Sequence, residues 1–209
     1  MNQLREEVLA TALAMNASGI NRGTAGNVSA RNGEGFLITP TGLANDEIAP
    51  ADIVAMNMDG SFSGNRKPSS EWRFHRDIYA RRPEAGAVVH AHSPFATALA
   101  CMDSPIPAFH YMVARFGGND VRCAAYAIFG SQELSDSVVQ ALQGRSACLL
   151  SHHGMLAVGR DLRQALSLAV ELETLSEQYW RVLQIGEPHL LPEDEMARVL
   201  EKFAGYGQQ

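Results

Sequence analysis

The stretch AVVHAHSPF (residues 87–95) decides the fold, because an apolar run ends there in two closely spaced histidines. An unbroken apolar run bounded by glycine and proline predicts a strand that is covered on both faces, as in a layered α/β protein. Side chains alternate along a strand, so His90 and His92 project from the same face. Two imidazoles placed in this way could reach one ion, although such a pair can also be an ordinary hydrogen-bonded feature of a strand end.

Helical patterns flank this strand on both sides. Residues 69–83, SSEWRFHRDIYARRP, have helical spacing with Ser70 as the expected N-cap, and residues 93–103, SPFATALACMD, predict a second helix. Strands and helices also alternate along the rest of the chain. Strands are expected at residues 35–40, 52–60 and 122–129 and as a pair around a turn within 147–159. Helices are expected near residues 2–18, over 131–144 with Ser131 near the start, over 161–186 with Asp161 as the cap, and as a short helix in the tail that begins at residue 191. Interleaved strands and helices with no repeat or linker predict one α/β domain over residues 1–209.

Composition excludes several classes of function. The 209-residue chain is 46% hydrophobic and carries a net charge of -6 without a basic cluster, which disfavours nucleic acid or an anionic membrane as a partner. No apolar run approaches the roughly 20 residues of a membrane span, and the N-terminus lacks the order of a signal peptide, so we expect a soluble, cytoplasmic protein. Cys101, Cys123 and Cys148 stand in apolar contexts, which predicts buried, reduced thiols.

Further residues could complete a metal site around the histidine pair. Residues 149–155, LLSHHGM, place His152 and His153 at the end of another apolar strand, and Glu71 begins the helix before the histidine strand. Three imidazoles with a labile fourth position are typical of catalytic zinc, with iron, cobalt or manganese as chemical substitutes. Spacing alone does not choose between His152 and His153. His75 and His110 are also candidates on chemistry, but His75 lies on the apolar side of its helix, which favours a role in the core or at its rim.

Three stretches could bind an anion beside this metal. They are NRGTAGNVSAR (21–31), TPTG (39–42) and PSSE (68–71). Glycines with small polar neighbours let backbone amides approach an anion, and serines at a helix N-terminus lie where the helix dipole favours negative charge. Each stretch could also be an ordinary turn or cap, but the serines directly precede Glu71, which favours an anion pocket next to the metal.

Taken in order, these motifs resemble the class II aldolase family that also contains ribulose-5-phosphate 4-epimerases, and the likeness is strongest to its L-fuculose-1-phosphate aldolases. The stretches that carry it are GTAGNVSAR (23–31), LITPTG (37–42), KPSSEWRFHRDIY (67–79), AVVHAH (87–92), AFHYM (108–112), GGND (117–120), FGSQELS (129–135), LLSHHGMLAVG (149–159) and VLEKFAGYG (199–207). The resemblance implies a three-layer α/β/α fold around a mostly antiparallel sheet. It also implies a homotetramer with an active site at each subunit interface.

The resemblance assigns a role to each candidate residue. One zinc ion per subunit would be held by Glu71, His90, His92 and His153, with Glu71 also the catalytic acid/base. Tyr111 would act in catalysis across the interface. The substrate phosphate would be bound by Gly26, Asn27, Thr41, Gly42, Ser69 and Ser70. The aldehyde half of the substrate would lie against Phe129, Phe203 and Tyr206.

The activity that follows is zinc-dependent, reversible cleavage of a sugar phosphate, a ketose 1-phosphate of the L-fuculose 1-phosphate type. The products would be dihydroxyacetone phosphate and an aldehyde such as L-lactaldehyde, formed through a metal-stabilised enediolate. We expect Tyr111 to handle the proton of the C4 hydroxyl and Glu71 to exchange a proton with the enediolate carbon.

Other functions remain open at this point. Arg115 and Phe116 stand where fuculose aldolases tend to have small residues, so the substrate could be 5-deoxyribulose 1-phosphate or 5-methylthioribulose 1-phosphate. A pentose-phosphate 4-epimerase or a methylthioribulose-phosphate dehydratase would use a similar site. A non-catalytic zinc or sugar-phosphate binding module is disfavoured, because it would need neither Glu71 nor Tyr111.

Overall fold

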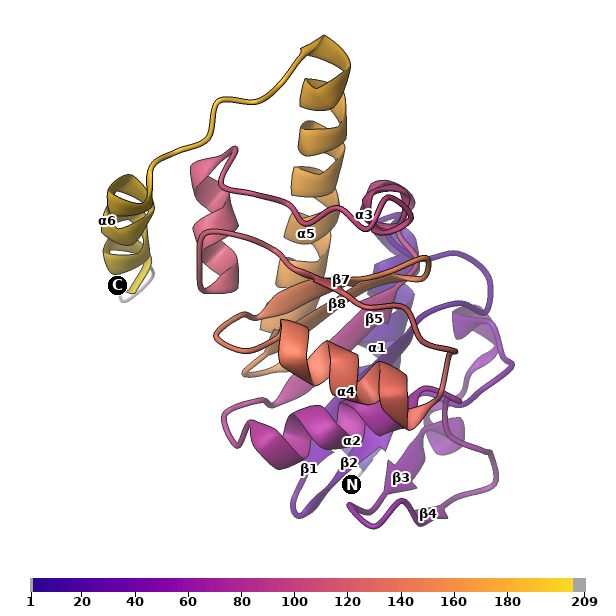
Figure 1. The fold of residues 1–209 in the computed structure, drawn as a ribbon. Coiled ribbons are helices and arrows are strands. Elements are labelled where there is room, and N and C mark those ends of the chain that lie inside the picture. Colours follow the sequence, from indigo (N-terminus) through magenta and orange to yellow (C-terminus); the bar gives the residue numbers. More distant parts are fainter. Residues whose placement is uncertain (1, 205–209) are drawn as a thin grey trace.

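An eight-stranded sheet with the order β4-β3-β2-β1-β5-β8-β7-β6 lies at the centre of the molecule (Figure 1). The structure is a computed structural model that describes residues 2–204. The strands are β1 (Asn27–Asn32), β2 (Gly35–Ile38), β3 (Val54–Met56), β4 (Phe62–Ser63), β5 (Ala87–Ala91), β6 (Cys123–Ala124), β7 (Ala147–Leu150) and β8 (Gly154–Gly159). Neighbouring strands run antiparallel except at the parallel pair β6–β7, so the predicted mostly antiparallel sheet is confirmed.

Helices cover both faces of the sheet (Figure 1). One face carries α1 (Asn2–Ala17), α3 (Pro94–Ala100) and α5 (Leu162–Ile185), and the other carries α2 (Trp72–Arg81) and α4 (Gln132–Ala141). The short 3-10 turns are η1 (Asn45–Glu47), η2 (Pro50–Asp52) and η3 (Tyr111–Phe116). The three-layer α/β/α prediction is therefore confirmed. Within residues 2–204, no helix combines the length and the apolar character needed to cross a membrane.

Strand β5 shows why its sequence is apolar throughout. Every residue from Ala87 to Ala91 is buried, because Val89 packs into the core beneath α1 and α5 while Val88 packs beneath α2 and α4. A strand between two helical layers has no solvent face. His90 follows Val88 on the α2 side, which is where the polar groups of the site gather.

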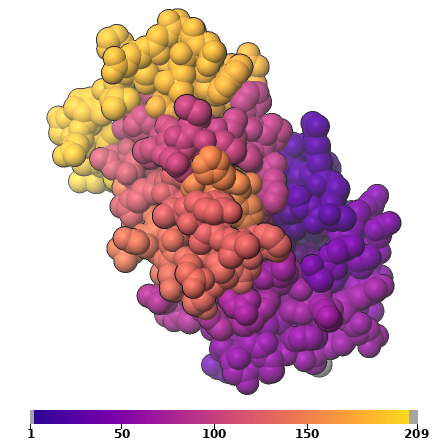
Figure 2. All heavy atoms as spheres, turned by 45° about the vertical axis from the view of Figure 1, so that its right-hand side comes forward, coloured from indigo at the N-terminus to yellow at the C-terminus, as the bar shows by residue number. Residues whose placement is uncertain are grey.

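The C-terminal helix α6 (Glu193–Ala204) lies outside these layers and packs against η3. Figure 2 shows the yellow C-terminal segment at one end of the molecule, with the purple segments of the first half of the chain at the other end.

The helix caps follow the sequence with one exception. Ser131 begins α4 by accepting a hydrogen bond from the Leu134 backbone, and Asp161 begins α5 in the same way from Gln164. The predicted cap at Ser70 is wrong, because α2 begins one residue later and Glu71 occupies the N-cap position. The Ser69 hydroxyl instead accepts a hydrogen bond from the Glu71 backbone.

Several other expectations need correction. The strand predicted over residues 52–60 is limited to β3, because the backbone turns after it and Asn57 N–H donates to Ser61 O at 2.9 Å. Strand β1 was not expected, because the stretch 21–31 was interpreted as a glycine-rich turn.

The strand predicted over residues 122–129 is limited to Cys123–Ala124, because its partner β7 ends at Leu150, opposite Ala124, and β6 is the edge strand. The prediction of three buried thiols holds only for Cys148, since Cys123 is half-buried and Cys101 lies exposed after the last turn of α3. Burial raises the pKa of Cys123 to about 11, so this thiol stays protonated near neutral pH.

Candidate metal centre and pocket

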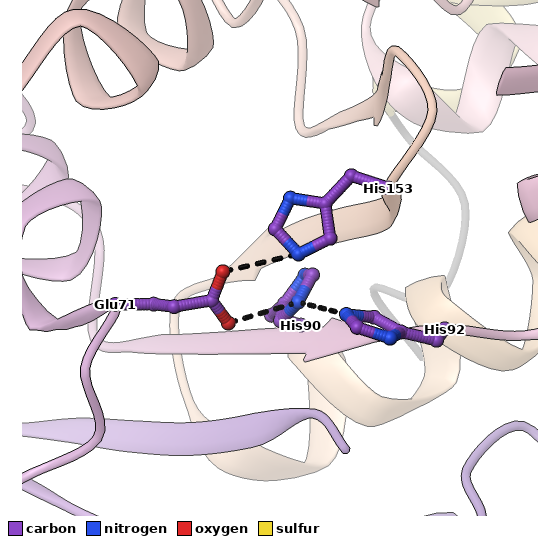
Figure 3. Close-up of side chains that lie close together, drawn as sticks. All are labelled: Glu71, His90, His92 and His153. Carbon is purple, nitrogen blue, oxygen red and sulfur yellow. Dashed lines mark hydrogen bonds and ion pairs between the residues drawn. The ribbon is translucent and has the colours of Figure 1, made fainter. Parts of the chain in front are cut away.

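Four side chains from three parts of the chain point toward one another (Figure 3). Glu71 stands at the start of α2, His90 is near the end of β5, His92 follows this strand, and His153 lies in the turn between β7 and β8. One ligand atom from each lies within 4.8 Å of the other three. The Glu71 carboxylate is 3.2 Å from His90 Nε2 and 3.0 Å from His153 Nε2, and the Nε2 atoms of His90 and His92 are 3.0 Å apart.

The tight turn after β7 decides which histidine joins the group. His152 adopts φ 52°, in the left-handed region, and its half-exposed ring lies near Asp103 and edge-on to Tyr126. The next residue, His153, is thereby directed toward Glu71. The structure therefore places His153, and not His152, in the group of four side chains.

The hydrogen bonds of His90 fit it for metal binding. Its Nδ1–H donates to the Met155 carbonyl oxygen at 2.8 Å, which leaves the lone pair of Nε2 directed at the other three side chains. Among the described residues, the buried Glu71 Oε1 accepts no hydrogen bond of regular geometry, although His153 Nε2 lies 3.0 Å away. A single cation among these atoms would satisfy them all, since ligands of a tetrahedral zinc ion lie about 3.3 Å apart. Three imidazoles and a carboxylate suit zinc best by ligand type.

Electrostatics favours the metal-binding form of Glu71 and His92. For His90, burial acts to lower the pKa, but Glu71 outweighs burial and the pKa is raised instead, so His90 would release its proton as a metal binds. Burial acts to raise the pKa of Glu71, but the adjacent His90 and His153 outweigh burial and hold the pKa well below its ordinary value. Burial and the neighbouring imidazoles lower the pKa of His92 to about 4. Near neutral pH the carboxylate is therefore anionic and His92 is neutral, as metal ligands must be.

A pocket of about 340 Å³ opens above the four side chains. Three of the metal candidates, Glu71, His92 and His153, line it directly. The lining also contains all six residues expected to bind phosphate and one expected at the aldehyde end: Gly26, Asn27, Thr41, Gly42, Ser69, Ser70 and Phe129. A concave site of this size with a few converging polar groups suits a small polar molecule.

Backbone contacts hold the phosphate candidates together. The Thr41 backbone donates to Lys67 O at 3.1 Å, and the Ser69 backbone donates to Thr39 O at 3.0 Å. Gly26 has φ 74°, and a Cβ atom there would lie 2.7 Å from the His90 carbonyl oxygen. Only glycine fits this close approach between the glycine-rich turn and the histidine strand.

The structure does not bring Tyr111 and Phe203 to this pocket. Tyr111 is half-exposed on η3 and stacks on Phe203 of α6, with ring centroids 6.4 Å apart. Tyr206 lies outside the described residues. Arg115 forms an ion pair with Glu171 of α5 and Phe116 is fully buried, so neither lines the pocket of its own chain.

Sequence reasoning missed several pocket residues, among them Thr24, Tyr126 and Ala127. Thr24 lies in the glycine-rich turn and could have been named from its hydroxyl. Tyr126 and Ala127 were hidden by the incorrect strand over residues 122–129, because a strand would have turned one of them away from the site.

Comparison with known proteins places the chain in a family. Residues 6–180 match the family described as the class II aldolase and adducin N-terminal domain. The chain is 59% identical over 204 residues, 98% of its length and 92% of the relative's, to a 5-methylthioribulose-1-phosphate/5-deoxyribulose-1-phosphate aldolase of Rhodospirillum rubrum. It is 47% identical over 207 residues to an L-fuculose phosphate aldolase of Escherichia coli, covering 99% of this chain and 96% of that one. A solved structure of an L-fuculose 1-phosphate aldolase superposes with a TM-score of 0.95 at 38% identity, covering 98% and 97% of the two chains.

Proposed function

Because the chain belongs to the class II aldolase and adducin N-terminal domain family and is a class II aldolase, we propose that it cleaves 5-methylthioribulose 1-phosphate or its 5-deoxy analogue. The observation that carries this proposal is the 59% identity, over 98% of the chain, to an aldolase named for both compounds. The L-fuculose 1-phosphate favoured from the sequence has weaker support, at 47% identity. We also propose that residues 1–209 form a single domain.

The reaction breaks the bond between C3 and C4 of the ketose. Its electron pair stays on C3 next to the C2 carbonyl, and C3 then takes up a proton to give dihydroxyacetone phosphate. The C4 hydroxyl loses its proton and becomes the aldehyde, which carries the methylthio group or the unsubstituted methyl group of C5. A divalent ion, zinc best by ligand type, would act as a Lewis acid that stabilises the charge on the carbonyl oxygen by several kcal/mol.

Glu71 is the residue we assign to proton exchange at C3. Its carboxylate is buried at the base of the pocket, is anionic near neutral pH and contacts both His90 and His153. Asn27 donates a hydrogen bond to Glu71 Oε2 at 2.9 Å and so also holds the carboxylate. General acid–base catalysis of this kind contributes about 10²–10⁴-fold.

A homotetramer would complete the pocket. We assign Tyr111, Phe203 and Tyr206 to the pocket of a neighbouring subunit, where Tyr111 would take the C4 hydroxyl proton. The support is that Tyr111 and Phe203 stack on one another outside their own chain's pocket, while Phe129 at the pocket is 66% exposed. Sedimentation should give a mass four times the 22.7 kDa of one chain, and a monomeric active enzyme would refute this assignment.

A substrate panel tests the proposed reaction. The metal-loaded protein is incubated with 5-methylthioribulose 1-phosphate, 5-deoxyribulose 1-phosphate and L-fuculose 1-phosphate, and released dihydroxyacetone phosphate is measured with a coupled dehydrogenase. We expect kcat/KM for the first two to exceed that for the third by about tenfold or more, the usual scale for one altered substituent. A higher kcat/KM with L-fuculose 1-phosphate would reverse the assignment. Epimerisation or loss of water without triose phosphate release would identify a 4-epimerase or a dehydratase instead.

The phosphate site is tested at Gly26. A Gly26→Ala variant is expected to raise KM for the ketose 1-phosphate by about tenfold or more, because its Cβ would push the turn and Asn27 away from His90 O. The matched control is Gly23→Ala in the same turn, which also has positive φ, at 64°, but has no atom within 4 Å of the added Cβ. An unchanged KM in a folded Gly26→Ala variant would argue against a phosphate site here, and equal effects in both variants would show that backbone strain alone is responsible.

A further inference from the structure

A line of buried polar side chains leads away from Glu71 between β1 and α2. Glu71, His75 and Tyr79 are spaced four residues apart and share one face of α2. Asn27 and Ser29 are two residues apart and share the face of β1 that meets this helix. The two sets interlock, and all five side chains are buried.

Short hydrogen bonds connect these side chains into one chain. The Asn27 amide nitrogen lies 2.9 Å from Glu71 Oε2, and Asn27 Oδ1 lies 2.5 Å from His75 Nε2. On its other side, His75 Nδ1 is 2.6 Å from the Ser29 hydroxyl, which is 2.7 Å from the Tyr79 hydroxyl.

The direction of every hydrogen bond is fixed by the carboxylate at the end. A carboxylate only accepts, so Asn27 must present its NH₂ group to Glu71 and its Oδ1 to His75. His75 must therefore carry its proton on Nε2, and its Nδ1 accepts from Ser29. Burial lowers the pKa of His75 to about 3, which keeps the ring neutral with this single proton. Ser29 Oγ is then left to accept from Tyr79, so all donors point toward Glu71.

A line of this kind is not needed for packing. Polar groups buried between a helix and a sheet gain little net stability over apolar groups of the same shape, and each is costly if it loses its partner. Fully satisfied networks instead specify one arrangement of their members. Here the member at the end is the carboxylate assigned to proton exchange.

We propose that His75 is a positioning residue, which orients the Asn27 amide and through it the Glu71 carboxylate for proton exchange at C3. This role rests on the proposed aldolase function. His75 touches neither the pocket nor the metal candidates within hydrogen-bond distance, and its effect passes through Asn27. Loss of this support would leave Asn27 free to rotate its amide and Glu71 free to take other orientations.

The experiment compares His75→Met with His75→Gln. The two side chains are similar in length, but only glutamine keeps an N–H donor near the position of Nε2. We expect His75→Met to lower kcat by about tenfold or more, the effect of a misplaced catalytic group, with KM and bound metal nearly unchanged. The kcat of His75→Gln should stay within about threefold of that of the protein without substitutions, since the N–H donor is retained.

A second measurement isolates the proton step. Without aldehyde, the enzyme should exchange one carbon-bound proton of dihydroxyacetone phosphate with deuterated water, which NMR follows directly. His75→Met should slow this exchange by the same factor as kcat. If His75→Met does not fold, Ser29→Ala takes its place, because it removes the donor that holds His75 Nδ1 as an acceptor, and we expect a several-fold loss of both rates.

A folded variant with the kcat and exchange rate of the unchanged protein would overturn the role of His75, as would a loss confined to KM or to metal content. A different result would refute the proposed aldolase function itself: the metal-loaded protein without substitutions would release no triose phosphate from any ketose 1-phosphate.

Discussion

Replacing Glu71 with glutamine is expected to lower kcat for ketose 1-phosphate cleavage by about 10²–10⁴-fold. Glutamine has nearly the same size but cannot exchange the proton, while His90, His92 and His153 remain to hold the metal. Metal content measured by elemental analysis should therefore change little. Glu34→Gln is the matched control, because Glu34 is an exposed glutamate in the turn between β1 and β2 and should leave kcat unchanged. Full activity in Glu71→Gln would remove Glu71 from the mechanism.

Mixing subunits extends this experiment to Tyr111. If each pocket combines Glu71 of one chain with Tyr111 of a neighbour, tetramers assembled from equal amounts of Glu71→Gln and Tyr111→Phe chains contain some intact pockets. Random assembly should restore roughly a quarter of full activity. Mixed tetramers that are no more active than the two variants would show that each pocket is complete within one chain.

Metal removal is the second change with a large expected effect. Dialysis against a chelator such as dipicolinate should reduce cleavage to about one-thousandth, since a Lewis acid contributes several kcal/mol and each 1.36 kcal/mol is tenfold. Added zinc should restore the activity. His153→Ala should likewise lose the ion, because only two of the three candidate imidazoles then remain.

The adjacent histidine provides the control. His152→Ala alters a ring that faces Asp103 instead of the metal candidates, so it should retain the metal. If His153→Ala retained the metal and His152→Ala lost it, His152 would be the metal ligand in place of His153. Cleavage that persists after complete metal removal would refute the metal-dependent mechanism.

Much of the fold could be predicted because its signals are local. The apolar run of β5, the caps Ser131 and Asp161 and the helical spacing of α5 depend on neighbouring residues, and the structure has each of them. The errors arose where distant partners decide the outcome. Strand β6 stops where β7 stops, which no property of residues 122–129 reveals.

In the candidate site, too, local patterns predicted some features and tertiary contacts determined the others. The gathering of Glu71, His90 and His92 could be anticipated from strand alternation and from the position of one helix. Residue spacing did not choose between His152 and His153, and only the family resemblance favoured His153, whose direction follows from the left-handed backbone of His152. The hydrogen-bond partners of His75 could not be predicted, because the packing of α2 against β1 is a tertiary contact. The burial of His75 does agree with the core role predicted from the helix pattern.

The shortness of β6 has a consequence for how new activities could arise on this scaffold. The end of β5 is confined by glycines on both sides, since a Cβ at Gly26 would meet His90 O at 2.7 Å and one at Gly154 would meet Ala91 O at 2.5 Å. Residues 125–129 follow β6 without strand pairing and bring Tyr126 and Phe129 to the pocket. Directed evolution of aldehyde preference should therefore succeed most readily in this segment, where side chains can be exchanged without disturbing the backbone that carries the histidines.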